Sequence, residues 1–253
     1  MSTLITRRSL VAGAASGAGL LLSGCDQLAQ NEGFRNILYK ADDAHRVLQT
    51  ALTPRSALAT EFRPDQMSPI FRANGTLNPG GAVYGQHVAE KFANWQLDIS
   101  GLVAHPMKLS LAQLRAMPQR TQITRHDCVE GWSAIGKWHG AMLGDIMKAA
   151  GIKSSARYVI FHCADLYNGK NYYESIDMFD VFHPQTILAW QMNDALITVP
   201  HGAPLRLRAE RHLGYKQAKY VMGVEAVATL GNHGLGQGGY WEDNVDYDTF
   251  AGI

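Results

Sequence analysis

The chain has 253 residues, of which 46% are hydrophobic and 18% are charged, and its formal net charge at pH 7 is +1. This length and apolar content suffice for one large globular domain or two small ones. The balanced charge argues against a nucleic-acid-binding protein, because such proteins usually carry a basic face. Three cysteines, Cys25, Cys128 and Cys163, are too few for a disulfide framework.

The first 25 residues have the layout of a bacterial export signal. Arg7 and Arg8 precede the uncharged stretch 9–24, and the tetrad Leu22-Ser23-Gly24-Cys25 resembles a lipobox, whose cysteine is acylated. Paired arginines before an apolar stretch are typical of twin-arginine signals, which export folded proteins. The stretch is short for a membrane-spanning helix, which needs about 20 residues. We therefore expect a signal at 1–25, a periplasmic location and membrane attachment through lipidated Cys25. A cleaved signal without lipid is the alternative.

Residues 26–64 are expected to form an N-terminal helix and a linker. Apolar residues recur at helical spacing from Glu32 to Leu52, which predicts an amphipathic helix that covers the core or links it to the anchor. Four prolines between positions 53 and 87, namely Pro54, Pro64, Pro69 and Pro79, predict mostly irregular backbone there.

Residues 65–253 are expected to form the main domain, built from short strands and short helices. Helices are predicted at 110–117, where Ser110 and Gln113 form a capping box, and at 140–150. Strands are predicted at 95–99, 122–126, 157–163, 172–176, 204–208 and 220–229. Because strands and helices do not alternate regularly, we predict an α+β fold with mixed sheets. On strand 204–208, alternation should place Arg206 and Arg208 on one face.

Cys128 stands at the end of a predicted strand, within the segment Arg125-His126-Asp127-Cys128-Val129-Glu130-Gly131-Trp132-Ser133. Nearby positive charge favours the thiolate, which is the metal-binding form of cysteine. Soft sulfur suits a soft or high-valent metal that is held by further sulfur ligands, such as a dithiolene. The absence of a Cys-x-x-Cys pair argues against a structural zinc site. From these residues alone, a buried and inert cysteine is equally compatible.

The segment 128–133, with Gly136-Lys137-Trp138-His139-Gly140 behind it, resembles the metal-binding segment of sulfite-oxidase-like molybdopterin oxidoreductases. Further matching segments follow the family's order and cover roughly residues 65–230: Phe71–Gly75, Phe161–Asp165, His201–Leu207 and Gly214–Lys219. The resemblance implies an α+β domain that holds one molybdenum–molybdopterin cofactor. It makes Cys128 the metal ligand, and the cofactor carries the redox chemistry while the protein orients it.

The resemblance also assigns residues that contact the cofactor. They are Arg72, Asn74, Gly75, Cys128, Cys163, His201, Arg206, Lys216, Gln217, Ala218 and Lys219. Cations and backbone amides among them suit the phosphate of the cofactor. Relatives in the sulfoxide-reductase branch often have threonine in place of Cys163 and asparagine in place of His201. For each of these residues the alternative role is packing or a solvated surface position.

The resemblance favours two-electron oxygen-atom transfer on a small sulfur or N-oxide compound. The metal-binding segment is most similar to the Cys-Val-Glu-Ala-Trp-Ser of periplasmic methionine sulfoxide reductases, with Gly131 in place of alanine. The Gly-Asn-Arg-Arg of animal and plant sulfite oxidases is absent. His126 and Tyr172 are catalytic candidates beside Cys128, because such a site needs donors for an oxyanion or an S=O oxygen. Asp165, Tyr167 and Lys137 are weaker candidates for the same role.

A separate electron-transfer partner is expected, linked to haem or quinone, because the sequence contains no Cys-x-x-Cys-His haem motif and no clustered cysteines. Two other readings stay open. The chain could be a copper- or zinc-binding periplasmic lipoprotein that uses His126, Cys128 and His139, or a cofactor-free relative that only scaffolds a complex. The G-x-G-x-x-G pattern at 234–239 is rejected as a dinucleotide site, because no strand–helix unit accompanies it.

Overall fold

The computed structural model describes residues 28, 30–37, 40, 41, 44, 48, 54–245 and 247–252. It divides into two compact units, Met1–Arg55 and Ser56–Ile253. In the first unit the described residues from position 32 to 48 are helical, in line with the predicted amphipathic helix. The predicted signal at 1–25, including Cys25, lies outside the described residues. Among the helices that the structure describes, none is long and apolar enough to span a membrane.

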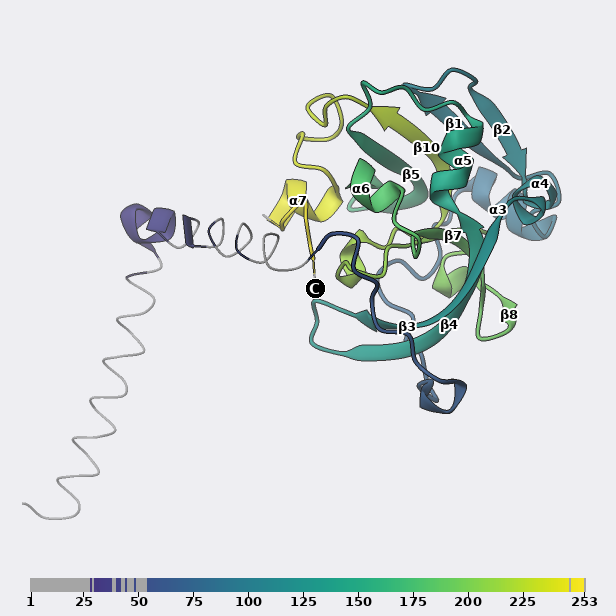
Figure 1. Ribbon diagram of the computed structural model, residues 1–253, viewed down its shortest axis with the longest axis horizontal. Coiled ribbons are helices and arrows are strands. Elements are labelled where there is room, and N and C mark those ends of the chain that lie inside the picture. Colours follow the sequence, from purple (N-terminus) through teal and green to yellow (C-terminus); the bar gives the residue numbers. More distant parts are fainter. Residues whose placement is uncertain are drawn as a thin grey trace, which may run out of the picture. The chain divides into compact units, whose positions relative to one another are not determined.

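The second unit is built on two five-stranded sheets (Figure 1). The first sheet has the order β2-β1-β10-β5-β6, and its strands are β1 (Gln96–Gly101), β2 (Met107–Ser110), β5 (Tyr158–Tyr167), β6 (Lys170–Asp177) and β10 (Val221–Val227). The β1–β10 pair is parallel and the other pairs are antiparallel. This sheet is therefore mixed, as predicted.

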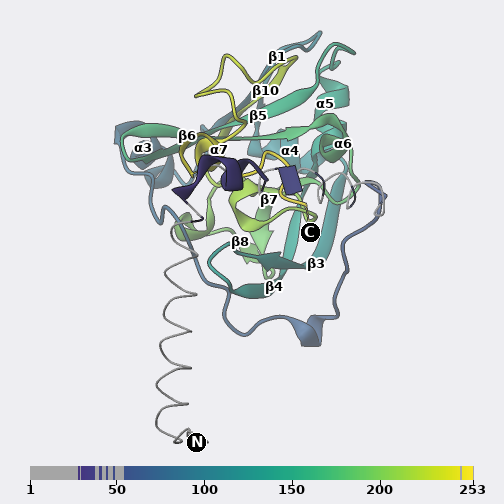
Figure 2. The same ribbon diagram turned by 90° about the vertical axis from the view of Figure 1, so that its left-hand side faces the viewer.

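The second sheet is antiparallel and lies below the first in the turned view (Figure 2). It consists of β3 (Gln119–Asp127), β4 (Ser133–Met142), β7 (Ile187–Met192) and β8 (Ala195–Leu196), with β9 (Arg206–Arg208) paired to β7. The long β3–β4 hairpin pairs His126 with Ala134 and Thr121 with His139. The hairpin loop, residues 128–132, therefore begins two residues after His126, directly after the last pair, Asp127 with Ser133.

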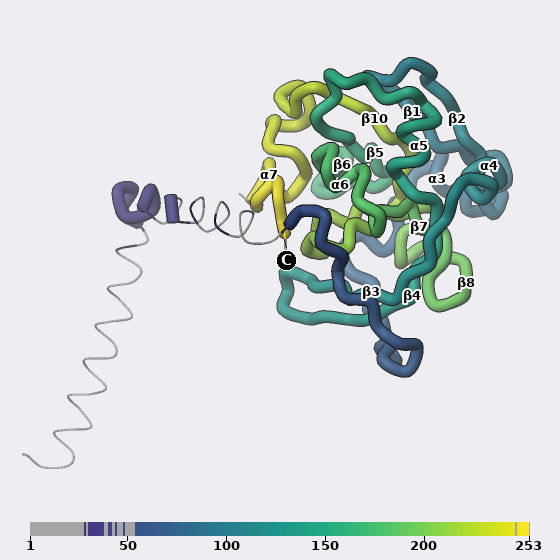
Figure 3. The backbone as a smooth tube through the Cα atoms, in the orientation of Figure 1, coloured from purple at the N-terminus to yellow at the C-terminus, as the bar shows by residue number. Residues whose placement is uncertain are grey.

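Short helices connect and flank the sheets, and the chain path can be followed in Figure 3. They are α3 (Ala82–Ala89), α4 (Leu111–Ala116), α5 (Leu143–Ala149), α6 (Met178–Val181) and α7 (Tyr240–Val245), with 3-10 turns η1 (Pro64–Gln66), η2 (Val199–His201) and η3 (Gly214–Lys216). The predicted capping box is present: Ser110 Oγ accepts from Gln113 N at 3.2 Å, and Gln113 Oε1 accepts from Ser110 N at 2.9 Å. The α+β prediction is confirmed.

One apolar core joins the two sheets. Its fully buried members include Leu97 and Phe161 from the first sheet, Leu188 and Leu207 from the second, and Ile146 from α5. Alternation along β1 buries Leu97 and Ile99 and exposes the residues between them, as expected for a strand with one face in the core. This shared core therefore holds the two sheets face to face. Residues of both sheets can contribute to one site at their edge.

Two expected boundaries differ from the structure. The helix predicted at 140–150 begins only at Leu143, because residues 140–142 still pair with β7. The domain begins before residue 65, because the preceding segment is bonded to it: Ala59 N donates to Gln185 Oε1 at 2.7 Å, and Phe62 N donates to Ile123 O at 2.8 Å. Backbone that lacks a helical or strand pattern can still be ordered by such side-chain acceptors.

A buried ion triad connects three of these elements. Lys216 Nζ in η3 lies 2.5 Å from Glu174 Oε1 in β6 and 2.5 Å from Glu242 Oε1 in α7, and all three side chains have 0% exposure in these ion pairs. Burial raises the pKa of Glu174 well above its usual value, with the neighbouring Glu242 adding to the effect, despite the Lys216 ammonium. The Lys216 ammonium group offsets the cost of burying these two carboxyl groups.

Replacement of this lysine should therefore be costly. We expect Lys216→Met to lower the free energy of unfolding by about 3–5 kcal/mol, because it leaves buried acidic groups without their cation. Urea unfolding monitored by circular dichroism measures the change. The exposed Lys153 is the matched control, and Lys153→Met should change stability by less than about 0.5 kcal/mol. Equal stability of the two variants would refute the stabilising role of the triad.

His183 gives the domain a pH-dependent stability. It is 6% exposed, its Nε2 lies 3.2 Å from Ala57 O, and its Nδ1 accepts from Gln185 N at 3.2 Å. Burial lowers its pKa. As the pH falls below the usual histidine value, the unfolded chain binds a proton here before the folded chain does, so this group loses stabilising effect toward acid.

We therefore expect the wild type to lose more unfolding free energy than His183→Asn between about pH 7.5 and about pH 5.5. Asparagine does not titrate, and its carbonyl oxygen can still accept from Gln185 N. Urea titrations of both proteins at the two pH values measure the difference. A variant that follows the wild type at both values would show that His183 is protonated equally in both states.

Candidate active site

A cavity of about 480 Å³ lies where loops from both sheets meet. Its walls come from the segment 71–76, the β3–β4 loop, the β5–β6 region, η2, Arg206, the segment 214–219 and the C-terminal region. The lining residues that the sequence had singled out are Arg72, Asn74, Gly75, His126, Cys128, Asp165, Tyr167, Tyr172, His201, Arg206, Gln217, Ala218 and Lys219. The structure thus gathers most of the predicted site in one place.

Cys128 opens the loop between β3 and β4. Its N–H donates to Trp132 O at 2.9 Å, and its carbonyl accepts from Gly131 N at 3.0 Å. Gly131 has a φ of 84°, which glycine adopts without strain, so this tight turn explains the glycine within the motif. Asn74 Nδ2 donates to Cys128 Sγ at 3.3 Å. The half-buried sulfur therefore faces the cavity and has one fixed donor.

His126 precedes the cysteine by two residues and is 6% exposed. Its ring packs against Phe71 and Trp132, with centroid distances of 5.6 Å to each, and these two rings also contact each other at 6.4 Å. Arg208 Nη1 lies 3.1 Å from its Nδ1. Burial, with Arg208 and Arg206 adding to the effect, lowers the pKa of His126 well below its usual value. The imidazole is therefore neutral at physiological pH.

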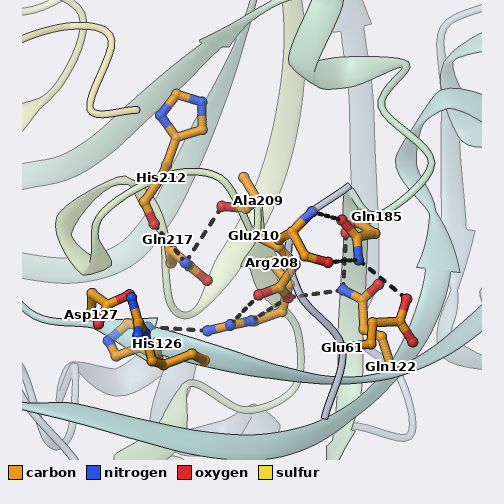
Figure 4. A network of polar contacts seen from close by, with 12 residues as sticks. Glu61, Gln122, His126, Asp127, Gln185, Arg208, Ala209, Glu210, His212 and Gln217 are labelled. Atoms are coloured by element: carbon orange, nitrogen blue, oxygen red, sulfur yellow. Dashed lines mark hydrogen bonds and ion pairs between the residues drawn. The ribbon is translucent and has the colours of Figure 1, made fainter. Parts of the chain in front are cut away.

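Arg208 belongs to a buried polar network behind the cavity (Figure 4). Its Nε and Nη2 donate to Glu210 at 2.9 and 2.5 Å. Gln122 Nε2 donates to Glu210 Oε1 at 2.8 Å and to Gln185 O at 3.0 Å. The network ties β9 to β3, and it fixes His126 through its Nδ1 atom.

Arg206 is a buried cation without a carboxylate partner. Its Nη1 donates to His201 O at 3.1 Å and its Nη2 to Gln217 O at 3.4 Å, while its Nε has no partner among the described residues. Burial, with Arg208 adding to the effect, lowers its pKa to about 9. Both arginines lie over the ring of Trp138, at 5.0 and 4.3 Å. Alternation does place them on one face, but that face is buried.

Lys219 supplies the second cation of this wall. Its Nζ donates to Asn74 O at 2.7 Å, to Pro200 O at 2.9 Å and to Thr76 O. Burial, with Arg206 adding to the effect, lowers its pKa to about 7. Because Lys219 bonds the carbonyls of residues 74 and 76, it also holds the segment that donates to Cys128.

His201 connects the segment 71–76 to Arg206. Its Nε2 lies 3.1 Å from Phe71 O and its Nδ1 lies 2.9 Å from Thr198 Oγ1. Burial lowers its pKa, so a neutral ring that donates from Nε2 and accepts at Nδ1 satisfies both neighbours. Its carbonyl holds Arg206, as described above. His201 therefore contributes to the cavity by position more than by a free polar atom.

The opposite wall is aromatic and only partly predicted. Tyr172 donates to Tyr215 O at 3.0 Å, and burial raises its pKa well above the usual value. Tyr215, Trp241 and Tyr247 complete this wall but were not identified as site residues. Tyr215 belongs to η3, within the matched segment 214–219, whereas Trp241 and Tyr247 reach the cavity through the packing of α7 and the residues after it, which no local pattern marks.

Asp165 also lines the cavity and is 4% exposed. Its Oδ1 has no partner among the described residues. Burial raises its pKa above the usual value, while a hydrogen bond from Thr76 acts in the opposite direction. A buried carboxyl oxygen without a partner is costly, so it indicates a ligand or water in the cavity.

Two predicted cofactor contacts lie elsewhere. Lys216 does not line the cavity, because its ammonium is held by Glu174 and Glu242 on the far side of η3. Cys163 is also absent from the lining, and its Sγ lies 3.8 Å from Phe161 O. Burial raises the pKa of Cys163 well above its usual value. In these two side chains, the polar atoms face the protein interior.

The alternative copper or zinc site is not formed. His139 pairs with Thr121 through Nδ1 and Oγ1 at 2.8 Å, and it stands five residues beyond Ala134, the partner of His126. That spacing separates it from the His126–Ala134 pair by about 17 Å along the strand. No cluster of three metal-binding side chains occurs among the residues that the structure describes. Lys137, a weak substrate candidate, is bound to Asp194 at 2.6 Å.

The cavity fits molybdopterin by its donor set. Cys128 offers a soft sulfur ligand, which suits molybdenum with further sulfur ligands. Arg206 is a buried cation and Lys219 a half-buried one, and both donate to carbonyl groups, so an anionic phosphate would complete their charge balance. Arg206 Nε and Gln217 Oε1 are buried without partners among the described residues, which leaves a donor and an acceptor for a polar ring system.

Comparison with known proteins agrees with this chemistry. The family described as "Oxidoreductase molybdopterin binding domain" matches residues 84–232. A protein of Azospira oryzae with the provisional name protein-methionine-sulfoxide reductase subunit YedZ1 is 35% identical over 250 residues, which cover 97% of this chain and 86% of the relative. The protein-methionine-sulfoxide reductase catalytic subunit MsrP of Campylobacter jejuni is 30% identical over 146 residues, or 52% of this chain and 48% of the relative.

The fold also resembles a solved structure. The sulfane dehydrogenase SoxCD from Paracoccus pantotrophus superposes with a TM-score of 0.50 at 19% identity, covering 70% of this chain and 46% of that chain. At this identity the likeness concerns the fold alone. Together with the sequence matches, it confirms the sulfite-oxidase-like resemblance. The chain therefore belongs to the family of oxidoreductases with a molybdopterin-binding domain, and molybdenum with molybdopterin is its cofactor.

Proposed function

We propose that this oxidoreductase is a periplasmic reductase that removes the oxygen atom from organic sulfoxides, such as the side chain of methionine sulfoxide. The observation that carries the proposal is the half-buried Cys128 sulfur, which faces a cavity that is also lined by the buried Arg206 and the half-buried Lys219. The names of the Azospira and Campylobacter relatives support methionine sulfoxide as the substrate. N-oxides are the second substrate class.

Different residues of the cavity would bind the metal and the phosphate of the cofactor. Cys128 would bind the molybdenum, and Asn74 Nδ2 would stabilise the thiolate through its hydrogen bond to Sγ. Arg206, Lys219 and the backbone of 217–219 would hold the phosphate end, with His201 placing Arg206. The bound cofactor supplies two-electron redox chemistry and oxygen-atom transfer. The protein itself has to orient the substrate and exclude competing ligands.

An uncharged substrate agrees with the charges that the cavity offers. A sulfur oxyanion such as sulfite would need free cations, because a charge is costly to bury without its counter-charge. In this proposal Arg206 and Lys219 would be occupied by the phosphate of the cofactor, and so would not be free to bind a second anion. The aromatic wall of Tyr172, Tyr215 and Trp241 suits an apolar thioether, because sulfur packs favourably against aromatic rings.

Electrons would come from a separate partner linked to haem or quinone. The chain would reach the periplasm folded, through the twin-arginine signal, and Cys25 would attach it to the membrane by a lipid. A membrane attachment would keep the enzyme close to a quinone-linked partner. The sequence features at Arg7, Arg8 and Cys25 support this location.

Replacement of the metal ligand tests the central claim. We expect Cys128→Ser to lose at least about 99% of sulfoxide reductase activity with reduced viologen as electron donor, because serine offers no soft ligand. Cys163→Ser is the matched control, since Cys163 lies outside the cavity, and it should keep its activity. Elemental analysis should find molybdenum in the wild type. Copper or zinc without molybdenum, or full activity of Cys128→Ser, would contradict the proposal.

A substrate screen separates the classes. Sulfoxides and N-oxides are offered with reduced viologen, and sulfite is offered with ferricyanide. We expect the highest kcat/KM for sulfoxides. Turnover of sulfite alone would reject the reductase and leave an oxidase.

The proposed location has its own test. Arg7→Lys combined with Arg8→Lys should leave the protein in the cytoplasm, because the twin-arginine pathway reads the arginine pair. Cys25→Ala should release the exported protein from the membrane fraction, since it removes the acylation site. Cell fractionation and immunoblotting measure both effects. Normal export of the double variant would exclude this route.

A further inference from the structure

We propose that His126 presents a fixed, neutral N–H group, Nε2–H, to the oxygen atom of the substrate, and that Arg208 positions it. The inference rests on the proposed function and deepens it, because it names the residue that would recognise the S=O oxygen. It depends on which ring nitrogen carries the proton and on what each edge of the ring faces.

The neighbour of Nδ1 determines whether this nitrogen donates or accepts a hydrogen bond. Arg208 Nη1 lies 3.1 Å from His126 Nδ1, and a guanidinium group has only donors. Nδ1 must therefore accept, and the proton of the neutral ring must lie on Nε2. Arg208 cannot turn away easily, because its side chain is 0% exposed, is bonded twice to Glu210, and lies 4.3 Å from the centroid of Trp138.

The Nε2 edge of the ring lies beside Gly214, which is also a residue of the cavity lining. Nε2 has no hydrogen-bond partner among the described residues, and His126 lines the cavity. Gly214 lies at this edge: a Cβ atom there would stand 2.7 Å from Nε2 and 2.8 Å from Cε1 of His126. Any other residue at position 214 would crowd the nitrogen. The absence of a side chain at 214 therefore keeps the N–H group accessible.

The ring is also held in its plane. Phe71 and Trp132 pack against it at 5.6 Å each, so the donor direction is set before a ligand arrives. A preorganised donor stabilises negative charge that develops on an oxygen atom without reorganisation. Because the ring is neutral, it favours a polar S=O oxygen without attracting anions from solution. It stands two residues before Cys128 and opens into the same cavity, which is where the reacting oxygen must come.

Nuclear magnetic resonance on the holoenzyme tests the donor directly. The full chain is labelled with 15N-histidine, and the His126 signals are assigned by their loss in His126→Gln. We expect the shifts of a neutral ring protonated at Nε2, and a downfield shift of its proton when dimethyl sulfoxide is added without reductant. Protonation at Nδ1, or an Nε2–H signal that ignores dimethyl sulfoxide, would overturn the inference.

Kinetics give a second, independent readout. His126→Leu should lower kcat/KM for dimethyl sulfoxide by about ten-fold or more, the effect of one fixed hydrogen bond to the reacting oxygen. His126→Gln should recover most of the loss, because its amide N–H can reach the position of Nε2. Gly214→Ala should lower kcat/KM with the imidazole in place. Molybdenum content is measured for each variant, so that loss of cofactor is not mistaken for loss of the donor.

His139→Leu is the matched control, since His139 lies on the same hairpin but pairs with Thr121 away from the cavity. It should retain wild-type kcat/KM. If the wild type reduces sulfoxides and His126→Leu does so equally well, the inference fails and the proposed function stands. If the wild type reduces no sulfoxide, the proposed function itself fails, whatever the His126 variants do.

Discussion

The ion pair between Arg208 in β9 and Glu210 just after this strand is completely buried, and both side chains have 0% exposure. Burial of such a pair carries a desolvation cost that close geometry and further hydrogen bonds must offset. Here Arg208 reaches Glu210 by two nitrogens and His126 by a third, and Glu210 also accepts from Gln122. The pair therefore holds β9 against β3. This contact also fixes the positions of Arg206, at the start of β9, and Cys128, directly after β3.

The cations inside and at the edge of the core have different kinds of partner. Lys216 faces two carboxyl groups, and Arg208 faces one. Among the described residues, Arg206 and Lys219 donate hydrogen bonds to carbonyl oxygens and to no carboxyl group. A charge that the protein leaves without a counter-charge indicates the place of an anionic ligand more reliably than a basic residue in a motif does. By this criterion we expect the phosphate end of the cofactor beside Arg206 and Lys219, while Lys216 stabilises the fold.

Local patterns predicted what local forces determine. The capping box of Ser110, the strand at 95–99 and the cysteine loop all depend on residues that are close in sequence. The strand β7 escaped notice, because its continuous apolar run has no period that separates a strand from a buried helix. The network around Arg208 joins residues 82 positions apart, and no spacing rule connects them. The family resemblance located the cavity, but it could not tell that Lys216 and Lys219, on either side of one turn, face in opposite directions.

The aromatic wall has a consequence for the order of assembly. The cavity begins with residues near position 71 and is completed by Trp241 and Tyr247, while Lys216 and Glu242 fasten α7 to the rest of the domain. These parts of the chain are synthesised at different times. The binding site is therefore incomplete until the C-terminal residues have been made. The cofactor can therefore enter only a finished domain. A transport route that moves folded proteins, as proposed for this chain, would allow loading to precede departure from the compartment of synthesis.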